Sequence, residues 1–240
     1  MTQKEATMAL DPVGDSLWLA EGGLVSFYGF PYPTRSVIAR LENGGLWVWS
    51  PVALTDELQT EVEALGPVAH LISPNKLHYL YLRDWQQVWP EAKLWGPAST
   101  LRKCRALNFE APLTDEAPQA WQGQIDQFWF RGSKAMDEIV FFHRPSSTAI
   151  IGDLSENFSE EFLQKHWGWL SRRVAKLWRI TEPWGHAPLE LRLSWTDKAP
   201  ARRALAALLA KEPERVIMAH GEWQRQDGRA YLEKAFTWLM

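Results

Sequence analysis

The chain opens with short stretches in which apolar and polar residues alternate, a period typical of β-strands. The turn at residues 42–45, Glu-Asn-Gly-Gly, predicts a hairpin between two of these stretches. After Thr55, which suits a helix cap, Leu58, Val62 and Leu65 share one helical face. The predicted strands are residues 17–20, 36–41, 46–50, 68–72 and 93–95, and the predicted helices are residues 55–65, 77–88 and 99–107.

The second half of the chain repeats this order of strands followed by alternating helices and strands. Such a repeat favours two sheets packed face to face with helices outside, an α/β fold that forms a four-layer αββα sandwich. With no linker-like segment in between, we expect a single domain over residues 1–240. The predicted strands are residues 125–130, 138–142, 148–151 and 215–219, and the predicted helices are residues 159–179, 199–211 and 228–239.

Composition removes several classes of function. There are 26 Lys and Arg residues against 29 Asp and Glu residues, so the net charge is −3, which argues against a nucleic-acid partner. The single cysteine, Cys104, excludes an internal disulfide and any zinc site built of several thiolates. The longest apolar run, residues 204–210, is too short for a transmembrane segment, and the first residues lack the pattern of a signal peptide. We therefore expect a soluble, cytoplasmic protein.

Residues that could carry out chemistry follow three of the predicted strands. His78 follows residues 68–72 in a short loop, Asp153 follows residues 148–151, and His220 follows residues 215–219. Functional side chains of α/β folds gather beyond the carboxyl ends of strands. Imidazole and carboxylate are the usual ligands of zinc or iron where thiolates are absent.

This arrangement resembles the metallo-β-lactamase superfold across nearly the whole chain. The segments that carry the resemblance are LWVWSPVAL, LISPNKLHYLYL, EIVFFHRPSSTAIIGDL and RVIMAHG. The last two are the most specific, because a strand ending in Gly-Asp and a later strand ending in His-Gly occur in the right order. The resemblance implies a metallo-β-lactamase-like sandwich with a metal site at these strand ends.

Within the superfold, the chain is most similar to a bacterial family of unknown function. That family has the loop Pro-Asn-x-x-His-His, which residues 74–79 match except at the last position, where Tyr79 stands. Trp85, Trp89 and Pro90 match the aromatic helix that follows the loop.

The departures from the superfold motif predict a reduced metal site. The motif's two leading histidines fall on Pro74 and Lys76, its aspartate falls on His78, and its last histidine falls on Tyr79. The aspartate that ends an early strand falls near Ser50. Only the Gly-Asp and the terminal histidine survive, so a dinuclear site cannot be rebuilt from these residues.

One metal ion can still be held by His78, Asp153 and His220, as zinc or iron with an open position for water. In that case the chain is a hydrolase-like protein acting on a small molecule, with Asp153 and His78 as its catalytic residues. The alternative is a non-catalytic, metal-free descendant that binds a ligand or a protein, with Lys76 paired to Asp153 in place of the metal. Neither alternative identifies a substrate. Further pocket or supporting residues are Asn75, Lys76, Tyr79, Glu138 and Glu222.

The chain is rich in tryptophan, with 15 residues of this type. We expect most of them to fill the core, and we expect Trp184, Trp195 and Trp223 to lie near the site. Several fall in residues 160–180, where apolar spacing predicts one long helix that packs in the core or in a homodimer contact. The alternative is a membrane-surface helix, because cations accompany the tryptophans.

Overall fold

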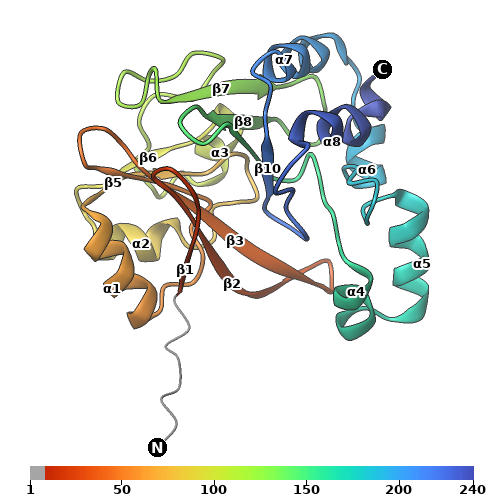
Figure 1. Ribbon diagram of the computed structural model, residues 1–240, viewed down its shortest axis with the longest axis horizontal. Helices are drawn as coiled ribbons and strands as arrows, with labels where there is room; N and C mark the ends of the chain where they lie inside the picture. Colours follow the sequence, from red (N-terminus) through yellow and green to blue (C-terminus); the bar gives the residue numbers. More distant parts are fainter. Residues whose placement is uncertain (1–8) are drawn as a thin grey trace, which may run out of the picture.

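The structure is a computed structural model that describes residues 9–240 (Figure 1). None of the described helices is long and apolar enough to cross a membrane. The strands are β1 (Leu10–Gly14), β2 (Leu17–Phe27), β3 (Phe30–Arg40), β4 (Leu46–Trp49), β5 (Val68–Ile72), β6 (Lys93–Trp95), β7 (Ile125–Phe130), β8 (Glu138–His143), β9 (Thr148–Ile151) and β10 (Arg215–Met218). The helices are α1 (Asp56–Leu65), α2 (Leu82–Val88), α3 (Ala98–Lys103), α4 (Glu160–His166), α5 (Trp169–Trp178), α6 (Leu189–Leu193), α7 (Ala199–Leu209) and α8 (Gly228–Ala235), followed by a 3₁₀ turn at Thr237–Leu239.

The strands form two sheets. The first has the order β1-β2-β3-β4-β5-β6, and its members are antiparallel up to β4 and parallel from β4 to β6. The second has the order β10-β9-β8-β7, in which only β9 and β10 are parallel. The parallel strands matter for the site, because their carboxyl ends point to one edge of each sheet.

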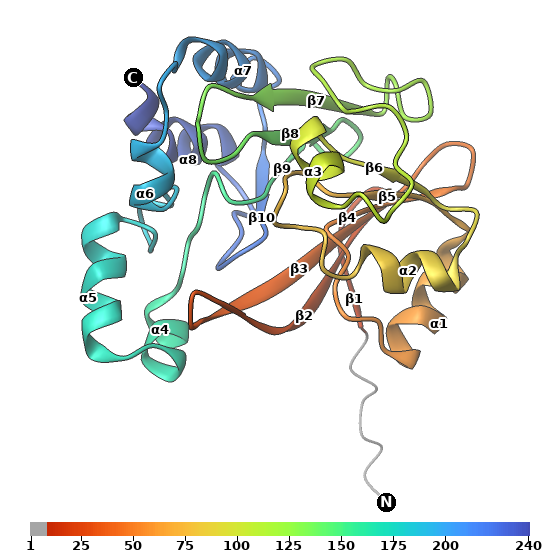
Figure 2. The same ribbon diagram turned by 180° about the vertical axis from the view of Figure 1, so that it is seen from behind.

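Three hydrophobic clusters show that the sheets are the inner layers of a four-layer sandwich. Alternate residues of β4 divide between two of them: Trp47 and Trp49 face the second sheet, while Leu46 and Val48 face α1 and α2. The third cluster joins the outer face of the second sheet to α7 and α8. Figures 1 and 2 show α1 and α2 on one side of the molecule and α7 and α8 on the other. The predicted αββα fold class is confirmed.

The predicted elements agree with the structure most closely in the buried strands. The strands at residues 68–72, 93–95, 125–130 and 148–151 have the expected bounds. The short strand β1 and helix α6 were not expected, and α2 begins at Leu82, after irregular turns, rather than at residue 77.

The predicted long helix over residues 159–179 is wrong, because Trp167 and Gly168 interrupt it and separate α4 from α5. The Trp167 backbone is extended, and its indole Nε1 donates to the carbonyl oxygen of Pro31 at 3.0 Å. The side chain thereby packs against the β2–β3 hairpin, where it contacts Phe30 and Tyr32. The helix is interrupted at Trp167 because this side chain packs against the hairpin.

This segment was expected to pack in the core or in a homodimer contact, and α4 packs in the core, whereas much of α5 does not. Leu163 is buried, whereas Trp169, Leu170 and Leu177 of α5 are exposed. Most of the other tryptophans do fill the core, and the completely buried ones are Trp47, Trp49, Trp85 and Trp121.

Candidate metal site

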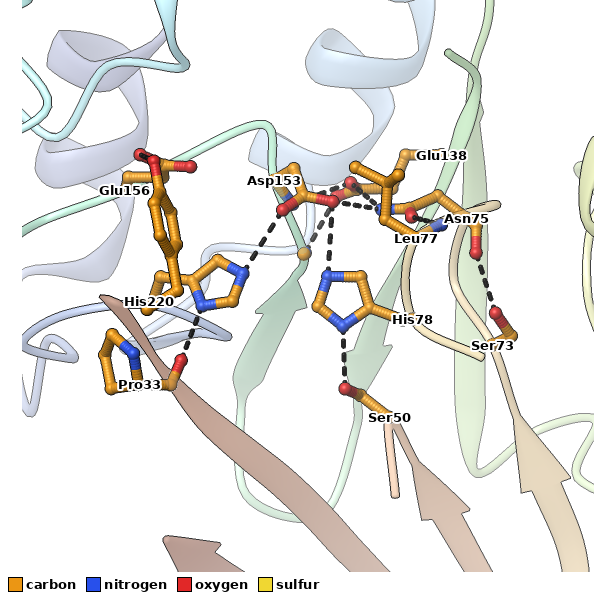
Figure 3. A network of polar contacts seen from close by, with 12 residues as sticks. Pro33, Ser50, Ser73, Asn75, Leu77, His78, Glu138, Asp153, Glu156 and His220 are labelled. Atoms are coloured by element: carbon orange, nitrogen blue, oxygen red, sulfur yellow. Dashed lines mark hydrogen bonds and ion pairs between the residues drawn. The ribbon is translucent and has the colours of Figure 1, made fainter. Parts of the chain in front are cut away.

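Three side chains from separate parts of the chain meet at one edge of the sandwich (Figure 3). His78 lies in the turns after β5, Asp153 lies after β9, and His220 lies after β10. His78 Nε2 is 3.2 Å from Asp153 Oδ2, and His220 Nε2 is 3.3 Å from Asp153 Oδ1. The sequence therefore predicted correctly which residues meet, because β5, β9 and β10 all end at this edge.

The second nitrogen of each imidazole fixes the orientation of its ring. His220 Nδ1 donates a hydrogen bond to the carbonyl oxygen of Pro33 at 2.7 Å, so in the neutral ring Nε2 presents its lone pair toward Asp153. His78 Nδ1 lies 2.7 Å from Ser50 Oγ, and the His78 ring stacks on Trp49. Metal-binding histidines are commonly held in this way by a hydrogen bond on the far nitrogen.

Buried hydrogen bonds position the Asp153 carboxylate. Asn75 Nδ2 donates to Asp153 Oδ2 at 2.7 Å and to Glu138 Oε2 at 2.8 Å. Glu138, which is completely buried, accepts the backbone N–H groups of Gly152 and Asp153, each at 2.8 Å. Asn75, in the loop after β5, and Glu138, in β8, thus hold the Asp153 carboxylate in place.

Charges in the site are strongly coupled. Burial alone would raise the pKa of Asp153, but the neighbouring His78 charge and the hydrogen bonds that both rings donate when protonated hold it well below its usual range. Burial alone would lower the pKa of His78, but the Asp153 charge and hydrogen bond raise it. Burial and the Asp153 charge raise the pKa of Glu138 to about 7, although the donated N–H groups oppose the shift.

The donor set fits a single zinc or iron ion. A tetrahedral zinc ion with bonds of about 2.1 Å holds its ligand atoms roughly 3.4 Å apart. The two separations that involve Asp153 are 3.2 and 3.3 Å, and the three ligand atoms lie within 4.8 Å of one another. Without an ion or a proton between them, the lone pair of His220 Nε2 and the Asp153 carboxylate would repel each other.

A cavity of about 190 Å³ opens beside these three side chains, which form part of its wall. Most of the remaining wall is apolar and comes from the β2–β3 hairpin and from residues 77–81. Lys103 supplies a cation at this wall, with its Nζ 4.5 Å from the centre of the Tyr79 ring. The site therefore has an apolar chamber with room for a small organic molecule beside the candidate metal position.

Several residues proposed from the sequence lie elsewhere. Lys76 does not line the cavity, and the expected pair between Lys76 and Asp153 is wrong, because the Asp153 oxygens bond to the two histidines and to Asn75. Glu222 is exposed and also lies outside the cavity wall, so its predicted pocket role is wrong. Tyr79 does line the cavity, as expected.

The expectation that three loop tryptophans lie near the site is also wrong. Trp195 is buried between the second sheet and its helices, and Trp223 packs against the cluster between the sheets. Trp184 stacks with Arg179. None of these residues is part of the cavity wall among residues 9–240.

Sequence reasoning missed one backbone acceptor and one buried acid. Pro33 contributes only its backbone carbonyl, and no side-chain pattern reveals such a role. Glu156 lines the cavity, is 2% exposed and accepts from the Tyr32 hydroxyl at 3.4 Å. Burial and the Asp153 charge raise its pKa well above the usual range for a carboxyl group. Its position three residues after the Gly-Asp element was the signal that could have identified it.

Comparison with solved structures shows the fold. The chain is similar to the DIM-1 metallo-β-lactamase exposed to ceftazidime, with a TM-score of 0.65, 14% identity and coverage of 96% of this chain and 95% of that chain. It is also similar to a metallo-β-lactamase from Pontibacter korlensis, with a TM-score of 0.63, 13% identity and coverage of 96% and 97%. The FIM-1 metallo-β-lactamase from Pseudomonas aeruginosa in its mono-zinc form gives a TM-score of 0.61, 12% identity and coverage of 98% and 96%.

Comparison by sequence shows the family. No curated protein matches the chain. The profile of a domain of unknown function, DUF4336, matches residues 15–164, which include His78 and Asp153 but end before His220. Since this match spans more than half of the chain, the protein belongs to the DUF4336 family and has the metallo-β-lactamase fold.

Proposed function

We propose that the protein is a metal-dependent hydrolase-like enzyme that holds one zinc or iron ion at His78, Asp153 and His220. The observation that carries the proposal is the orientation of the two imidazoles. Each has Nδ1 occupied by a protein oxygen and Nε2 directed at Asp153. Two imidazoles and one carboxylate leave coordination positions open, as catalytic sites require.

A metal ion bound there would supply a water whose pKa is lowered to about 7, and hence a hydroxide nucleophile. The chain's own residues hold a proton and position the carboxylate. In the metal-free protein Asp153 and His78 share one proton between Oδ2 and Nε2, and this proton would leave to solvent when the ion takes its place. Asn75 and Glu138 keep the Asp153 carboxylate in place through hydrogen bonds.

The cavity wall supports a small, largely apolar substrate. Tyr79 and the β2–β3 hairpin form much of this wall, and Lys103 provides a cation for an anionic group. The neutral carboxyl group of Glu156 keeps a proton at the same wall, because its pKa is raised well above the usual range. Similarity to metallo-β-lactamases does not make β-lactams the substrate, since the fold alone does not determine which substrate is bound.

A metal-free binding protein is the second candidate. It is favoured by the 3.2 Å ion pair between Asp153 and His78, which supplies a positive charge when His78 is protonated. In this case the same apolar cavity binds a ligand and catalyses no reaction.

Elemental analysis separates the two candidates. The protein is isolated without a chelator and without an immobilised-metal column, and its zinc and iron are measured. We expect close to one ion per chain, and we expect His220→Ala to weaken binding by more than about a hundredfold. His166→Ala is the matched control, because His166 lies on α4, outside the site. A wild-type chain that neither retains nor takes up either ion would favour the binding protein.

Activity is then tested on metal-loaded protein. Phosphoesters, lactones and thioesters are offered to the wild type and to His220→Ala. We expect turnover of at least one class by the wild type, and we expect it to be lost in the variant. Turnover that persists in His220→Ala would show that the reaction does not use this site.

We further propose that residues 1–240 act as one domain in the cytoplasm. Cys104 is a buried free thiol, which is common in reducing compartments. Cell fractionation checks the location.

A further inference from the structure

The outward face of α5 carries large exposed apolar side chains. Trp169 is 64% exposed, Leu170 is 60% exposed and Leu177 is 79% exposed. At about 100° per residue these three side chains fall on one side of the helix, together with Arg173. The opposite side carries the buried Ala175, which packs in the cluster beneath the β2–β3 hairpin. The helix is therefore anchored by one face and presents large apolar side chains to solvent.

Cations border this face, and α5 has no acidic residue. Arg172, Arg173 and Lys176 lie on the helix, and Arg179 caps its carboxyl end. Lys176 pairs with Glu160 at 2.6 Å, whereas Arg172 and Arg173 pair with no carboxylate among residues 9–240. This positive charge is local, because the whole chain has a net charge of −3.

Arg173 lies within the apolar face rather than at its border. Its guanidinium carbon is 5.4 Å from the centre of the Trp169 ring, a cation–π contact at the surface. A tryptophan, two leucines and a central arginine match the requirements of a lipid headgroup region, where apolar groups insert and cations meet phosphate.

A second copy of the chain fits this face less well. A two-fold symmetric contact places the same surface of both subunits together. Arg173 would then approach the Arg173 of the other copy, with no acidic residue on α5 to compensate the charge. An anionic membrane supplies both an apolar layer and the opposite charge.

We propose that α5 is a membrane-surface helix that docks the protein on bilayers containing anionic phospholipid. Trp169, Leu170 and Leu177 enter the boundary between headgroups and acyl chains, and Arg172 and Arg173 contact phosphate or carboxylate groups. Figures 1 and 2 show α5 at an outer edge of the molecule. The surface does not depend on the metal site, so its test stands apart from the proposed hydrolase.

The experiment is co-sedimentation of the full chain with lipid vesicles. One set is phosphatidylcholine alone, and the other contains equal parts of phosphatidylcholine and phosphatidylserine. We expect the wild type to sediment only with the anionic set. Each cation near such a surface strengthens binding by about fivefold, so Arg173→Glu, a reversal of charge, should weaken it by at least about tenfold. Leu177→Ser should weaken it by a similar factor.

Two control variants match these changes at other exposed positions. Arg203→Glu changes a surface arginine of α7, and Val88→Ser changes an apolar residue that is 38% exposed on α2. Both should bind as the wild type does, and thermal unfolding checks that all four variants fold. Wild-type protein that stays in the supernatant with anionic vesicles would overturn the proposal. So would binding that survives Arg173→Glu and Leu177→Ser, or light scattering that shows a wild-type dimer which Leu177→Ser separates.

Discussion

Glu138 and Glu156 are both buried near Asp153, but their surroundings favour different protonation states. Glu138 accepts three N–H groups, from Asn75, Gly152 and Asp153. Glu156 accepts only the Tyr32 hydroxyl, at 3.4 Å, among the described residues. Burial and the Asp153 charge raise the pKa of both groups, to about 7 for Glu138 and well above the usual range for Glu156. Glu138 is therefore suited to accept hydrogen bonds, and Glu156 to keep its proton.

The two glutamates should respond differently to replacement by glutamine. In Glu138→Gln the new NH₂ group meets an N–H donor at either oxygen position, because Gly152 N donates to Oε1 and Asp153 N to Oε2. We expect this change to lower the free energy of unfolding by about 1–3 kcal/mol. Glu156→Gln replaces a neutral carboxyl group by a neutral amide of similar shape, so it should change the free energy of unfolding by less than about 0.5 kcal/mol. Urea unfolding near neutral pH measures both, and equal losses would contradict the assignment.

At single positions, the sequence revealed the three side chains that meet at the site, and it missed the backbone carbonyl of Pro33 and the buried side chain of Glu156. His78, Asp153 and His220 could be found because each follows a strand that the apolar pattern predicted. The error at Lys76 has a physical cause: neighbouring residues in an irregular turn point in different directions, and no period predicts which one enters the cavity. The Pro33 carbonyl became relevant only once β3 lay beside the end of β10.

At the scale of elements, the end of β10 shows how backbone contact positions the His220 side chain. Gly221 follows His220 with φ +86°, and a Cβ added there would lie 2.3 Å from backbone atoms of Asn157. Gly123 also has a positive φ, +85°, but an added Cβ would meet nothing within 4 Å. The two glycines share the same conformational demand and differ in crowding.

This difference gives a prediction for the strand end. Gly123→Ala should lower the free energy of unfolding by about 1 kcal/mol, the strain of an alanine at positive φ. Gly221→Ala adds a backbone collision, so we expect a loss of about 3 kcal/mol and a displaced His220. Thermal unfolding and zinc titration of both variants check this, with weaker zinc binding expected only for Gly221→Ala. Similar stability losses would indicate that the segment at Asn157 moves aside readily.

The elements also show where helical periodicity fails. The pattern over residues 159–179 continues through Trp167, so it predicted one helix, but Trp167 packs under the β2–β3 hairpin and separates α4 from α5. The helix is interrupted because Trp167 contacts a hairpin that is distant in the sequence, and the local spacing of apolar residues cannot reveal such a contact. The buried strands were predicted more closely, because both faces of each strand meet apolar layers whatever their exact partners are.

At the scale of the whole molecule, the repeated order of strands and helices was enough to predict the αββα layers, and the layers bury three histidines away from the site. His70 lies in β5, His143 in β8 and His186 before α6, and each is at most 7% exposed. Burial lowers the pKa of each from 6.5 to about 4, and the charges of Lys93 on His70 and of Arg192 on His186 act in the same direction. The sandwich therefore holds these rings neutral.

The sign of the resulting pH dependence follows from proton binding. Between about pH 6.5 and about pH 4 the unfolded chain binds protons at these rings and the folded chain does not. Their contribution to stability is complete above about 6.5 and is lost as the pH falls toward about 4. His70→Gln removes one titrating ring and keeps an acceptor for Trp95 Nε1, which now donates to His70 at 3.2 Å. Urea unfolding across this range should show a shallower fall for His70→Gln than for the wild type, and parallel curves would mean that His70 is protonated without unfolding.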